Sequence, residues 1–411
     1  MSAAINDRLP LAPLLALAMA AFITILTEAL PAGLLPQMAQ ELSVSEAWAG
    51  QTVTIYALGS LVAAIPLTSA TQAFRRRPLL LTAIAGFVIA NTVTTFSSCY
   101  ALTMVARLLA GVAAGLLWAL LAGYAARMVP KHQQGRAIAV AMVGTPLALS
   151  LGVPAGTFLG TLVGWRICFG IISGLALILM LWVRLQVPDF AGQPRGRQLP
   201  LRCVFLLPGV RSVLSVVLTF VLAHNILYTY IAPFLMNAHM AEHTDRVLLI
   251  FGAASVLGIW VIGILIDRYL RVLTLLSTVL FGLSALILGI AGSEAGVIYV
   301  AVSAWGLAFG GAATLFQTAL TKTAEDAADV AQSMLVTAWN LAIAGGGVIG
   351  GVLLSHFGVG AFSPVLLVLL LATLVVVWAS GNRGFSNLGG RELEEGLSNQ
   401  SLKPTASRSC P

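Results

Sequence analysis

The chain has 411 residues, of which 59% are hydrophobic and only 9% are charged. Soluble domains carry about 25% charged residues, so this composition excludes a water-soluble protein and indicates a chain surrounded mostly by lipid and by its own helices. The net charge of +7 at pH 7 does not indicate a nucleic-acid partner, because the cationic residues separate apolar stretches and do not gather in a soluble domain.

Twelve apolar stretches follow one another along the chain, each long enough to cross a membrane. A helix needs about 20 mostly apolar residues to span a hydrocarbon core of roughly 30 Å. The predicted spans cover residues 11–35, 48–70, 78–97, 100–126, 137–161, 166–187, 211–235, 247–266, 272–292, 296–320, 330–355 and 362–380. The sequence therefore predicts an all-α integral membrane protein with twelve transmembrane helices.

The lysines and arginines are distributed unevenly between the two ends of these spans. Of the 22, all but Arg107, Arg166 and Arg246 lie at one face. Because the cytoplasmic loops of membrane proteins carry an excess of Lys and Arg, this face is predicted to be cytoplasmic. The N-terminus, the C-terminus and the middle loop would then all lie in the cytoplasm.

The two halves of the chain repeat each other. Glycines of the predicted fourth and fifth helices, and of the turn after the fifth, recur at a nearly constant offset of 194 or 195 residues. The pairs are Gly111 with Gly306, Gly115 with Gly310, Gly152 with Gly346, Gly156 with Gly350, and Gly164 with Gly358. Two pseudo-symmetric six-helix halves with a substrate site between them are typical of transporters. The predicted organisation is an N-terminal half at 1–187, a cytoplasmic middle loop at 188–210, a C-terminal half at 211–381 and a disordered cytoplasmic tail at 382–411.

Two charged residues lie well inside the predicted spans, away from their ends. Glu28, in the first helix, is the only acid there, and Arg107, in the fourth, is the only Lys or Arg well inside a span. An uncompensated charge in the membrane costs at least about 2.5–3.5 kcal/mol, so such residues usually face a cavity or each other. Both are expected at similar depth in the outer half of the membrane. Two interpretations stay open: a carboxylate that couples protons to transport, and a static ion pair that joins two helices.

The fifth predicted helix is rich in glycine and proline. Gly144, Gly152 and Gly156 allow a neighbouring helix to approach closely, and Pro154 bends the span. The pattern predicts tight helix packing, and a bend of this kind is also a candidate gate.

Polar and aromatic side chains in three later spans are candidates for a substrate cavity. His224 and Tyr228 share one face of the seventh helix, since they are four residues apart. The candidate cavity residues are His224, Asn225, Tyr228, Gln317, Trp339 and Asn340. For His224 a second interpretation stays open, namely an interhelical histidine whose hydrogen bonds are satisfied.

Two motifs look like enzyme signatures but lie in the wrong context. Gly345, Gly347 and Gly350 form a GxGxxG pattern within a predicted span, without the strand and soluble unit that dinucleotide binding requires. His239 and His243 belong to an HxxEH pattern in a short outer loop, where no folded domain completes a zinc site. We therefore expect no cofactor, no metal and no enzymatic activity, and no lysine lies in a Walker A motif that would indicate ATP hydrolysis.

Together these segments resemble the major facilitator superfamily over nearly the whole chain, to about residue 380. Residues 27–36 look like the twelve-spanner drug:proton antiporters, especially their arabinose-efflux and purine-ribonucleoside-efflux relatives. Residues 107–115 are similar to the family's helix-4 motif, whose arginine, here Arg107, is implicated in proton coupling. The Gly/Pro run of the fifth helix resembles the antiporter motif, which implies export.

A loop signature of the family is also present. Gly263, Asp267 and Arg268 match the copy of its GxLxDR motif between the eighth and ninth helices, which implies a gating element there. The corresponding loop between the second and third helices keeps the basic run at 75–77 but lacks the motif's glycine and aspartate, so an aspartate-based lock is not expected there.

The resemblance implies a proton-coupled exporter of small molecules, drug-like, sugar or nucleoside, that works by alternating access as a monomer in a bacterial inner membrane. Protonation of Glu28, tuned by Arg107, would alternate with substrate binding. Proton-coupled import is the alternative within this class. A receptor or sensor would need a sizeable soluble domain, and a membrane enzyme would need clustered catalytic groups within the spans; the sequence shows neither.

Overall fold

The computed structural model describes residues 9–193, 199–381 and 383–385, and nearly all of these residues outside short connections are helical. Apart from residues 383–385, the tail at 382–411, for which disorder is predicted, lies outside the described residues.

Ten continuous segments are long and apolar enough to cross a membrane. Arg246–Ala291, with 46 residues, contains the eighth and ninth predicted spans, and Ala295–Phe357, with 63 residues, contains the tenth and eleventh. In the first of these the backbone leaves helical geometry at Tyr269 (φ −126°, ψ 30°), so the chain bends there without a loop. The ten segments therefore hold all twelve predicted spans.

The first half of the chain runs from α1 to α9. Its helices are α1 (Leu11–Gly33), α2 (Leu35–Glu41), α3 (Glu46–Ala70), α4 (Arg76–Phe96), α5 (Tyr100–Arg127), the 3₁₀ turn η1 (Lys131–Gln133), α6 (Gln134–Met142), α7 (Gly144–Leu147), the π-helical turn η2 (Ala148–Gly152), α8 (Val153–Val163) and α9 (Trp165–Gln186). α2 is a short helix that follows the first span, and α6 to α8 together form the fifth.

The second half follows a short connecting helix, α10 (Leu201–Leu206). Its helices are α11 (Val210–Thr229), α12 (Ile231–Asn237), η3 (Ala241–His243), α13 (Thr244–Ala291), α14 (Ala295–Gly310), α15 (Ala312–Ala324), η4 (Glu325–Ala327), α16 (Ala328–Phe357), η5 (Val359–Ala361) and α17 (Phe362–Ala379). α13 supplies two spans, and α14 and α15 together form the tenth.

The repeat in sequence is also a repeat in packing. A Cβ at Gly115 of α5 would lie 2.6 Å from the carbonyl oxygen of Ser60, and one at Gly310 of α14 would overlap that of Ser255. Ser255 follows Ser60 by 195 residues, as Gly310 follows Gly115. Each half therefore brings two helices to backbone contact at matching positions, and glycine is the residue that permits it.

In the last glycine pair, backbone conformation and not close helix packing explains the choice of residue. Gly164 and Gly358 end the fifth and eleventh spans with φ of +85° and +71°. Residues with a Cβ rarely adopt positive φ, so both turns favour glycine.

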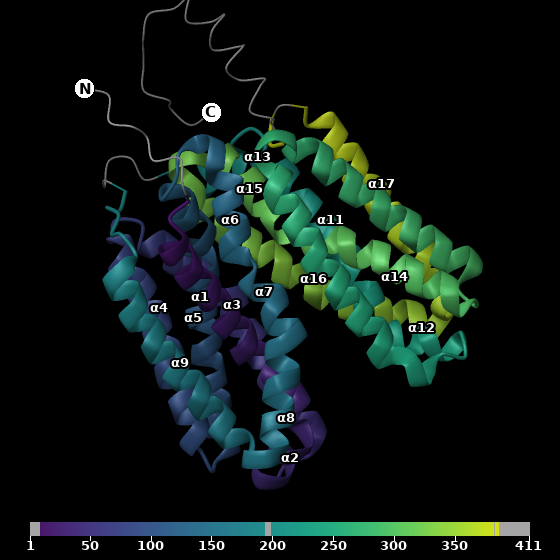
Figure 1. Cartoon of the computed structure of the whole chain (residues 1–411), viewed down its shortest axis with the longest axis horizontal. Coiled ribbons are helices and arrows are strands. Elements are labelled where there is room, and N and C mark those ends of the chain that lie inside the picture. The colour runs from purple at the N-terminus through teal and green to yellow at the C-terminus, as the bar shows by residue number, and fades with distance from the viewer. Residues whose placement is uncertain (1–8, 194–198, 382, 386–411) are drawn as a thin grey trace, which may run out of the picture.

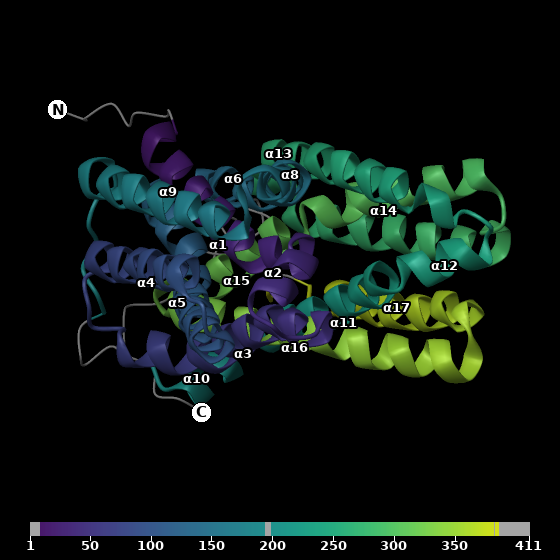
Figure 2. The same ribbon diagram turned by 90° about the horizontal axis from the view of Figure 1, so that it is seen from below.

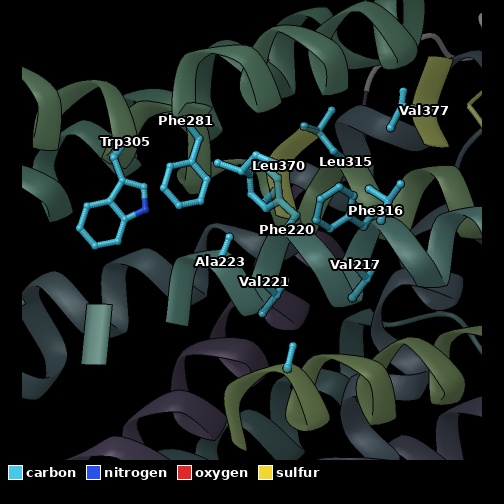
Figure 3. Packing of buried hydrophobic residues seen from close by; sticks show 14 of the residues in the cluster. Val217, Phe220, Val221, Ala223, Phe281, Trp305, Leu315, Phe316, Leu370 and Val377 are labelled. Atoms are coloured by element: carbon cyan, nitrogen blue, oxygen red, sulfur yellow. The ribbon is translucent and has the colours of Figure 1, made fainter. Parts of the chain in front are cut away.

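Each half has its own hydrophobic core, and the two cores meet where the halves touch. One cluster of buried residues is built mainly from α1 to α9 and the other from α11 to α17. In the second core Phe220 packs edge-on against Phe281 and Phe316, with ring centroids 5.5 and 5.4 Å apart (Figure 3). Ile259 of α13 belongs to the first cluster, and Ile65 of α3 packs against the second.

The halves touch at one end of the molecule and diverge at the other. α6 of the first half packs against α13 and α15 of the second, and α16 packs against α3 and α5. In Figure 1 the contacts of α6 lie at the end where α1 begins, whereas α2 and α8 lie far from α12 at the opposite end. Figure 2 shows the same division from below, with α4 and α9 on one side and α14 and α17 on the other. We call the end where α1 begins the terminal face and the opposite end the far face.

Candidate transport site

Arg107, on α5, is fully buried and binds the main chain of its neighbours. Its guanidinium donates hydrogen bonds to the carbonyl oxygens of Thr27 at 2.6 Å, Thr52 at 3.2 Å and Glu28 at 3.3 Å. Pro31 explains the need for the first of these, because proline has no N–H to offer the carbonyl four residues earlier in the helix. Arg107 thus replaces a missing hydrogen bond of α1.

The carboxylate of Glu28 takes no part in this arrangement. Among the described residues, no hydrogen bond or salt bridge joins the Glu28 side chain to Arg107, although the two charges are close enough to interact. The guanidinium carbon of Arg107 lies 4.9 Å from the ring centroid of Tyr56, which supports it on another side. The structure therefore brings the two predicted residues together through the main chain of Glu28, not through its carboxylate.

Two further side chains, which sequence analysis did not identify, bind the same turn of α1. The Tyr56 hydroxyl of α3 donates to the carbonyl oxygen of Thr24 at 3.1 Å. The amide of Asn91, on α4, donates to the Thr27 hydroxyl at 3.1 Å, and both residues are buried. With Arg107, these contacts fix the part of α1 that precedes Pro31 from three helices. The free carbonyl left by Pro31 was the one sequence signal that could have located this cluster.

The fifth span is broken as its prolines require. Pro146 and Pro154 lack the N–H groups that would bond to the carbonyls of Met142 and Ser150, and the chain there divides into α6, α7, η2 and α8. The π-helical turn η2 takes up the irregularity just before Pro154. The bend predicted from Pro154 is thus a series of short segments.

The glycines of this span lie against α1. A side chain at Gly144 would overlap a carbonyl oxygen of α1. A Cβ at Gly152 would lie 2.8 Å from the Phe22 ring, and one at Gly156 would lie 2.7 Å from the Leu30 side chain. All three glycines therefore occupy positions where α1 and the fifth span pack closely.

His224, on α11, lies in a stack of aromatic rings. Its imidazole is nearly parallel to the Phe309 ring of α14, with centroids 3.4 Å apart, and lies 5.2 Å from Tyr228, one turn further along α11. Phe251 and Trp305 enclose it at 5.7 and 5.3 Å. The buried Nδ1 atom has no hydrogen-bond partner, so the interpretation of a fully satisfied histidine does not describe this nitrogen.

The aromatic stack extends to α16. The Trp339 ring lies 6.2 Å from Phe309, so the structure places Trp339 in one cluster with His224 and Tyr228. Asn225 and Asn340 each donate their side-chain N–H to a carbonyl of their own helix, at 2.8 and 2.9 Å.

Gln317 belongs to a different group of buried polar side chains. Its main-chain carbonyl accepts a hydrogen bond from Gln332 of α16 at 2.8 Å, and its own side-chain oxygen is buried without a partner. The hydroxyls of Thr314 and Thr318, on the same helix, are also buried and unbonded. α15 therefore carries unmet hydrogen-bonding groups on successive turns.

At the terminal face, Asp267 of α13 joins the two halves. Its carboxylate accepts hydrogen bonds from the main-chain N–H groups of Gly135 at 2.7 Å and Arg136 at 3.1 Å. These groups lie in the first turn of α6, where N–H groups have no partner within the helix and a negative charge is favourable. Gly263 lets the helices approach, since a Cβ there would lie 3.0 Å from the Ala139 side chain.

Arg268, the third residue of the GxLxDR motif, has a different environment from Gly263 and Asp267. Arg268 is exposed and lies over the Tyr269 ring at 5.2 Å, and it forms no salt bridge in the part of the chain that the structure describes. Of the motif, Gly263 and Asp267 therefore lie at the contact between the halves, and Arg268 does not.

A second carboxylate, Asp329 at the start of α16, also joins the halves. It forms salt bridges with Arg76 at 2.8 Å and Arg127 at 2.9 Å, both in the first half. Sequence analysis did not identify Asp329, because an acid just before a predicted span is an ordinary first-turn residue. One sequence signal was present: the loop between the second and third spans lacks the family's aspartate, and Gln72 stands at the position that corresponds to Asp267, 195 residues earlier. The arginines near this loop therefore take their carboxylate partner, Asp329, from the second half.

The two motifs that look like enzyme signatures lie in different surroundings. Of the GxGxxG glycines, Gly345 and Gly350 face α11 and the residue that follows it: Cβ atoms there would lie 3.2 Å from the Leu222 side chain and 2.6 Å from the Tyr230 ring, whereas a Cβ at Gly347 meets nothing within 4 Å. Around the HxxEH segment and elsewhere in the described ranges, no group of three or more His, Cys, Asp or Glu could hold a metal ion.

Comparisons with known proteins agree with this architecture. Residues 17–331 match the family model of the Major Facilitator Superfamily. The purine ribonucleoside efflux pump NepI of Escherichia coli (strain UTI89 / UPEC) is 30% identical over 359 residues, which cover 86% of this chain and 90% of that protein. NepI of Salmonella paratyphi B is 31% identical over 366 residues, covering 88% of this chain and 91% of that protein.

Solved structures show the same fold at lower identity. The proton:xylose symporter XylE bound to 6-bromo-6-deoxy-D-glucose has a TM-score of 0.76 at 15% identity, over 94% of this chain and 99% of that chain. The transporter FucP in the outward conformation has a TM-score of 0.76 at 14% identity, over 91% of this chain and 100% of that chain. The twelve-helix arrangement, the sequence match over most of the chain and these structural likenesses lead to one conclusion: the chain belongs to the Major Facilitator Superfamily of membrane transporters, which are not enzymes.

Proposed function

We propose that the protein exports purine ribonucleosides or close relatives of them from a bacterial cytoplasm, in exchange for protons. The observation that carries this proposal is the 30–31% identity, over 86–88% of the chain, to proteins named as purine ribonucleoside efflux pumps. The similarity extends over both halves, and the substrate site of such transporters lies between the halves. The bacterial relatives support a location in the inner membrane.

The distribution of charge supports an orientation with the terminal face in the cytoplasm. This face carries Arg76, Arg127 and Arg136, whereas Arg166 and Arg246 lie toward the far face. A cytoplasmic excess of Lys and Arg is the rule for membrane proteins. Since the halves touch at the terminal face, the structure then corresponds to a state that is closed to the cytoplasm.

Glu28 is the group proposed to carry the proton. Its carboxylate has no bonded partner among the described residues, so taking up a proton breaks no ion pair, and the nearby charge of Arg107 favours release. When the halves rock to open the other face, water from that face reaches the carboxyl group. Protons and substrate can then move in opposite directions through one site.

The test is transport by the purified protein in proteoliposomes with an imposed pH gradient. A gradient of one pH unit supplies about 1.4 kcal/mol per proton, enough for about a tenfold concentration ratio of substrate at one proton per substrate. We expect Glu28→Gln to exchange labelled purine ribonucleoside without a gradient but to keep the ratio near one. Glu294→Gln, a matched change of an exposed acid at the start of α14, should behave as wild type.

Two results would contradict the proposal in different ways. A wild-type protein that transports no purine ribonucleoside would refute the substrate class. A Glu28→Gln variant that accumulates substrate as steeply as wild type would assign Glu28 a structural role and make His224 the next proton-carrying candidate.

A further inference from the structure

We infer that the second half carries a stacking site for a planar heteroaromatic ring, formed by Tyr228, Phe309 and Trp339, which we call the aromatic wall. This inference rests on the proposed function and names the residues that would bind the base. The three rings come from α11, α14 and α16, and each keeps part of its surface exposed. The exposed fraction of Tyr228 is 39%.

The wall is rigid because a second layer of rings supports it. His224 lies between Phe309 and Tyr228, with centroids 3.4 and 5.2 Å away. Behind Tyr228, Phe251 lies at 5.6 Å, and it packs on Trp305 at 4.4 Å. Rings held in this way present their faces without losing rotamer freedom when a ligand binds, which favours affinity.

Of the three helices that carry these rings, α16 packs directly against the first half, and α14 continues into α15, which does so as well. α16 packs against α3 and α5, α13 packs against α6 and α7, and α15, which continues α14, packs against α5 and α6. The exposed faces therefore belong to the inner side of the second half, where a transported molecule passes.

The flat aromatic rings suit a base better than a sugar, and the helices of the wall also carry hydrogen-bond acceptors. The side-chain N–H groups of Asn225 and Asn340 are already bonded to Val221 and Val336 of their own helices. Their side-chain oxygens remain as acceptors, which match the ring N–H and amino donors of a purine. The π face of a base stacks on aromatic rings whatever its substituents.

The decisive variant replaces Trp339, with a matched tryptophan elsewhere as the control. We expect Trp339→Leu to raise the half-saturating concentration of a labelled purine ribonucleoside in proteoliposomes about tenfold, equivalent to about 1.4 kcal/mol. Trp339→Phe keeps a ring and should stay within about threefold of wild type, because stacking tolerates a change of ring. Trp378→Leu removes a tryptophan that is 71% exposed on α17, and it should behave as wild type.

Competition identifies the part of the substrate that is recognised. Free purine base should inhibit nucleoside transport by wild type, and ribose at the same concentration should not. If Trp339→Leu is lost to misfolding, shown by gel filtration, the pair Tyr228→Phe and Tyr228→Leu makes the same comparison at another ring of the wall. Two results would refute the aromatic wall while leaving the exported substrate established. One is inhibition by ribose as strong as inhibition by the base. The other is a half-saturating concentration in Trp339→Leu or Tyr228→Leu that equals the value in Trp378→Leu.

Discussion

At the scale of single residues, Pro31 creates a need that Arg107 meets. The proline removes one N–H from α1, and the guanidinium of another helix then supplies a hydrogen bond to the carbonyl of Thr27 at 2.6 Å. A buried carbonyl without a partner would cost about 1–3 kcal/mol, so Arg107 stabilises α1 next to its proline. Because Arg107 binds main-chain carbonyls, it forms no salt bridge with the carboxylate of Glu28 among the described residues.

A double-mutant cycle tests this relation. Arg107→Leu should lower thermal stability in detergent strongly in the wild-type background. In a Pro31→Ala background, residue 31 regains an N–H for the Thr27 carbonyl, so the loss should be smaller by about 1 kcal/mol. Pro66→Ala, which changes another proline inside a helix, is the matched control and should leave the effect of Arg107→Leu unchanged. Equal losses in all three backgrounds would contradict the relation.

At the scale of helices, the fifth span shows how sequence determines packing. Two prolines divide it, and glycines at Gly144, Gly152 and Gly156 let the pieces lie against α1. Close approach of this kind is the main source of helix association within a membrane, where apolar side chains gain little by leaving lipid.

Substitution of one of these glycines should therefore be damaging, while a glycine in open space should tolerate the same change. Gly144→Ala would place a methyl group against a carbonyl oxygen of α1 and should destabilise the protein by about 1–3 kcal/mol. At Gly174 of α9, a Cβ meets nothing within 4 Å, and Gly174→Ala should be neutral or stabilise by up to about 1 kcal/mol. Thermal unfolding in detergent measures both, and equal melting temperatures would show that α1 can move aside.

The predicted spans follow from apolar length alone, which is why all twelve have a helical counterpart. The sequence did not predict which neighbouring spans are joined without a loop. In α13 two spans follow each other through a bend at Tyr269, because the short cationic segment there does not have to interrupt a helix. Partners across helices were also beyond the sequence. Nothing in the neighbourhood of His224 along the chain predicts that it lies parallel to Phe309, 85 residues later, because that contact depends on how α11 and α14 pack.

At the scale of the whole molecule, two aspartates of the second half hold the terminal face closed. Asp267 binds the first turn of α6, and Asp329 binds Arg76 and Arg127. Arg76 and Asp329 are only 1% and 2% exposed, so the pair is desolvated when the halves touch. Removing one partner of such a pair leaves an unpaired buried charge, which is strongly unfavourable.

Asp329→Asn should therefore shift the protein toward the state that is open at the terminal face. The fully buried Ser333, one turn further along α16, can report this as Ser333→Cys in a background without other cysteines. We expect an impermeant maleimide at the terminal face to label this thiol about tenfold faster in Asp329→Asn, corresponding to a shift of about 1.4 kcal/mol.

Asp189→Asn is the matched control for this experiment, because among the described residues Asp189 binds only residues of the first half and does not join the two halves. It accepts from the Arg77 N–H at 3.0 Å and from Arg75 at 2.6 Å. Desolvation raises the pKa of Asp189, but the hydrogen bonds and the positive charges of Arg75 and Arg77 together lower it by a larger amount. The pKa therefore lies below the ordinary value, and the carboxylate is charged at neutral pH. Its contribution to stability is present above the ordinary carboxylate pKa and disappears only as pH falls through the depressed value. Labelling at equal rates in all proteins would exclude Asp329 as a determinant of the closed state.

The division of charge at the terminal face also bears on how a protein of two repeated halves can evolve. An ancestor assembled from two identical halves must satisfy both sides of its contact with the same residues. Two copies of the present first half would have Gln72 in the place of Asp267 and Gln134 or Gly135 in the place of Asp329, at the offset of 194 or 195 residues, so Arg76 and Arg127 would lose their carboxylate partner. At this face each half therefore depends on residues that only the other half supplies, and two identical copies of either half would lack part of the contact.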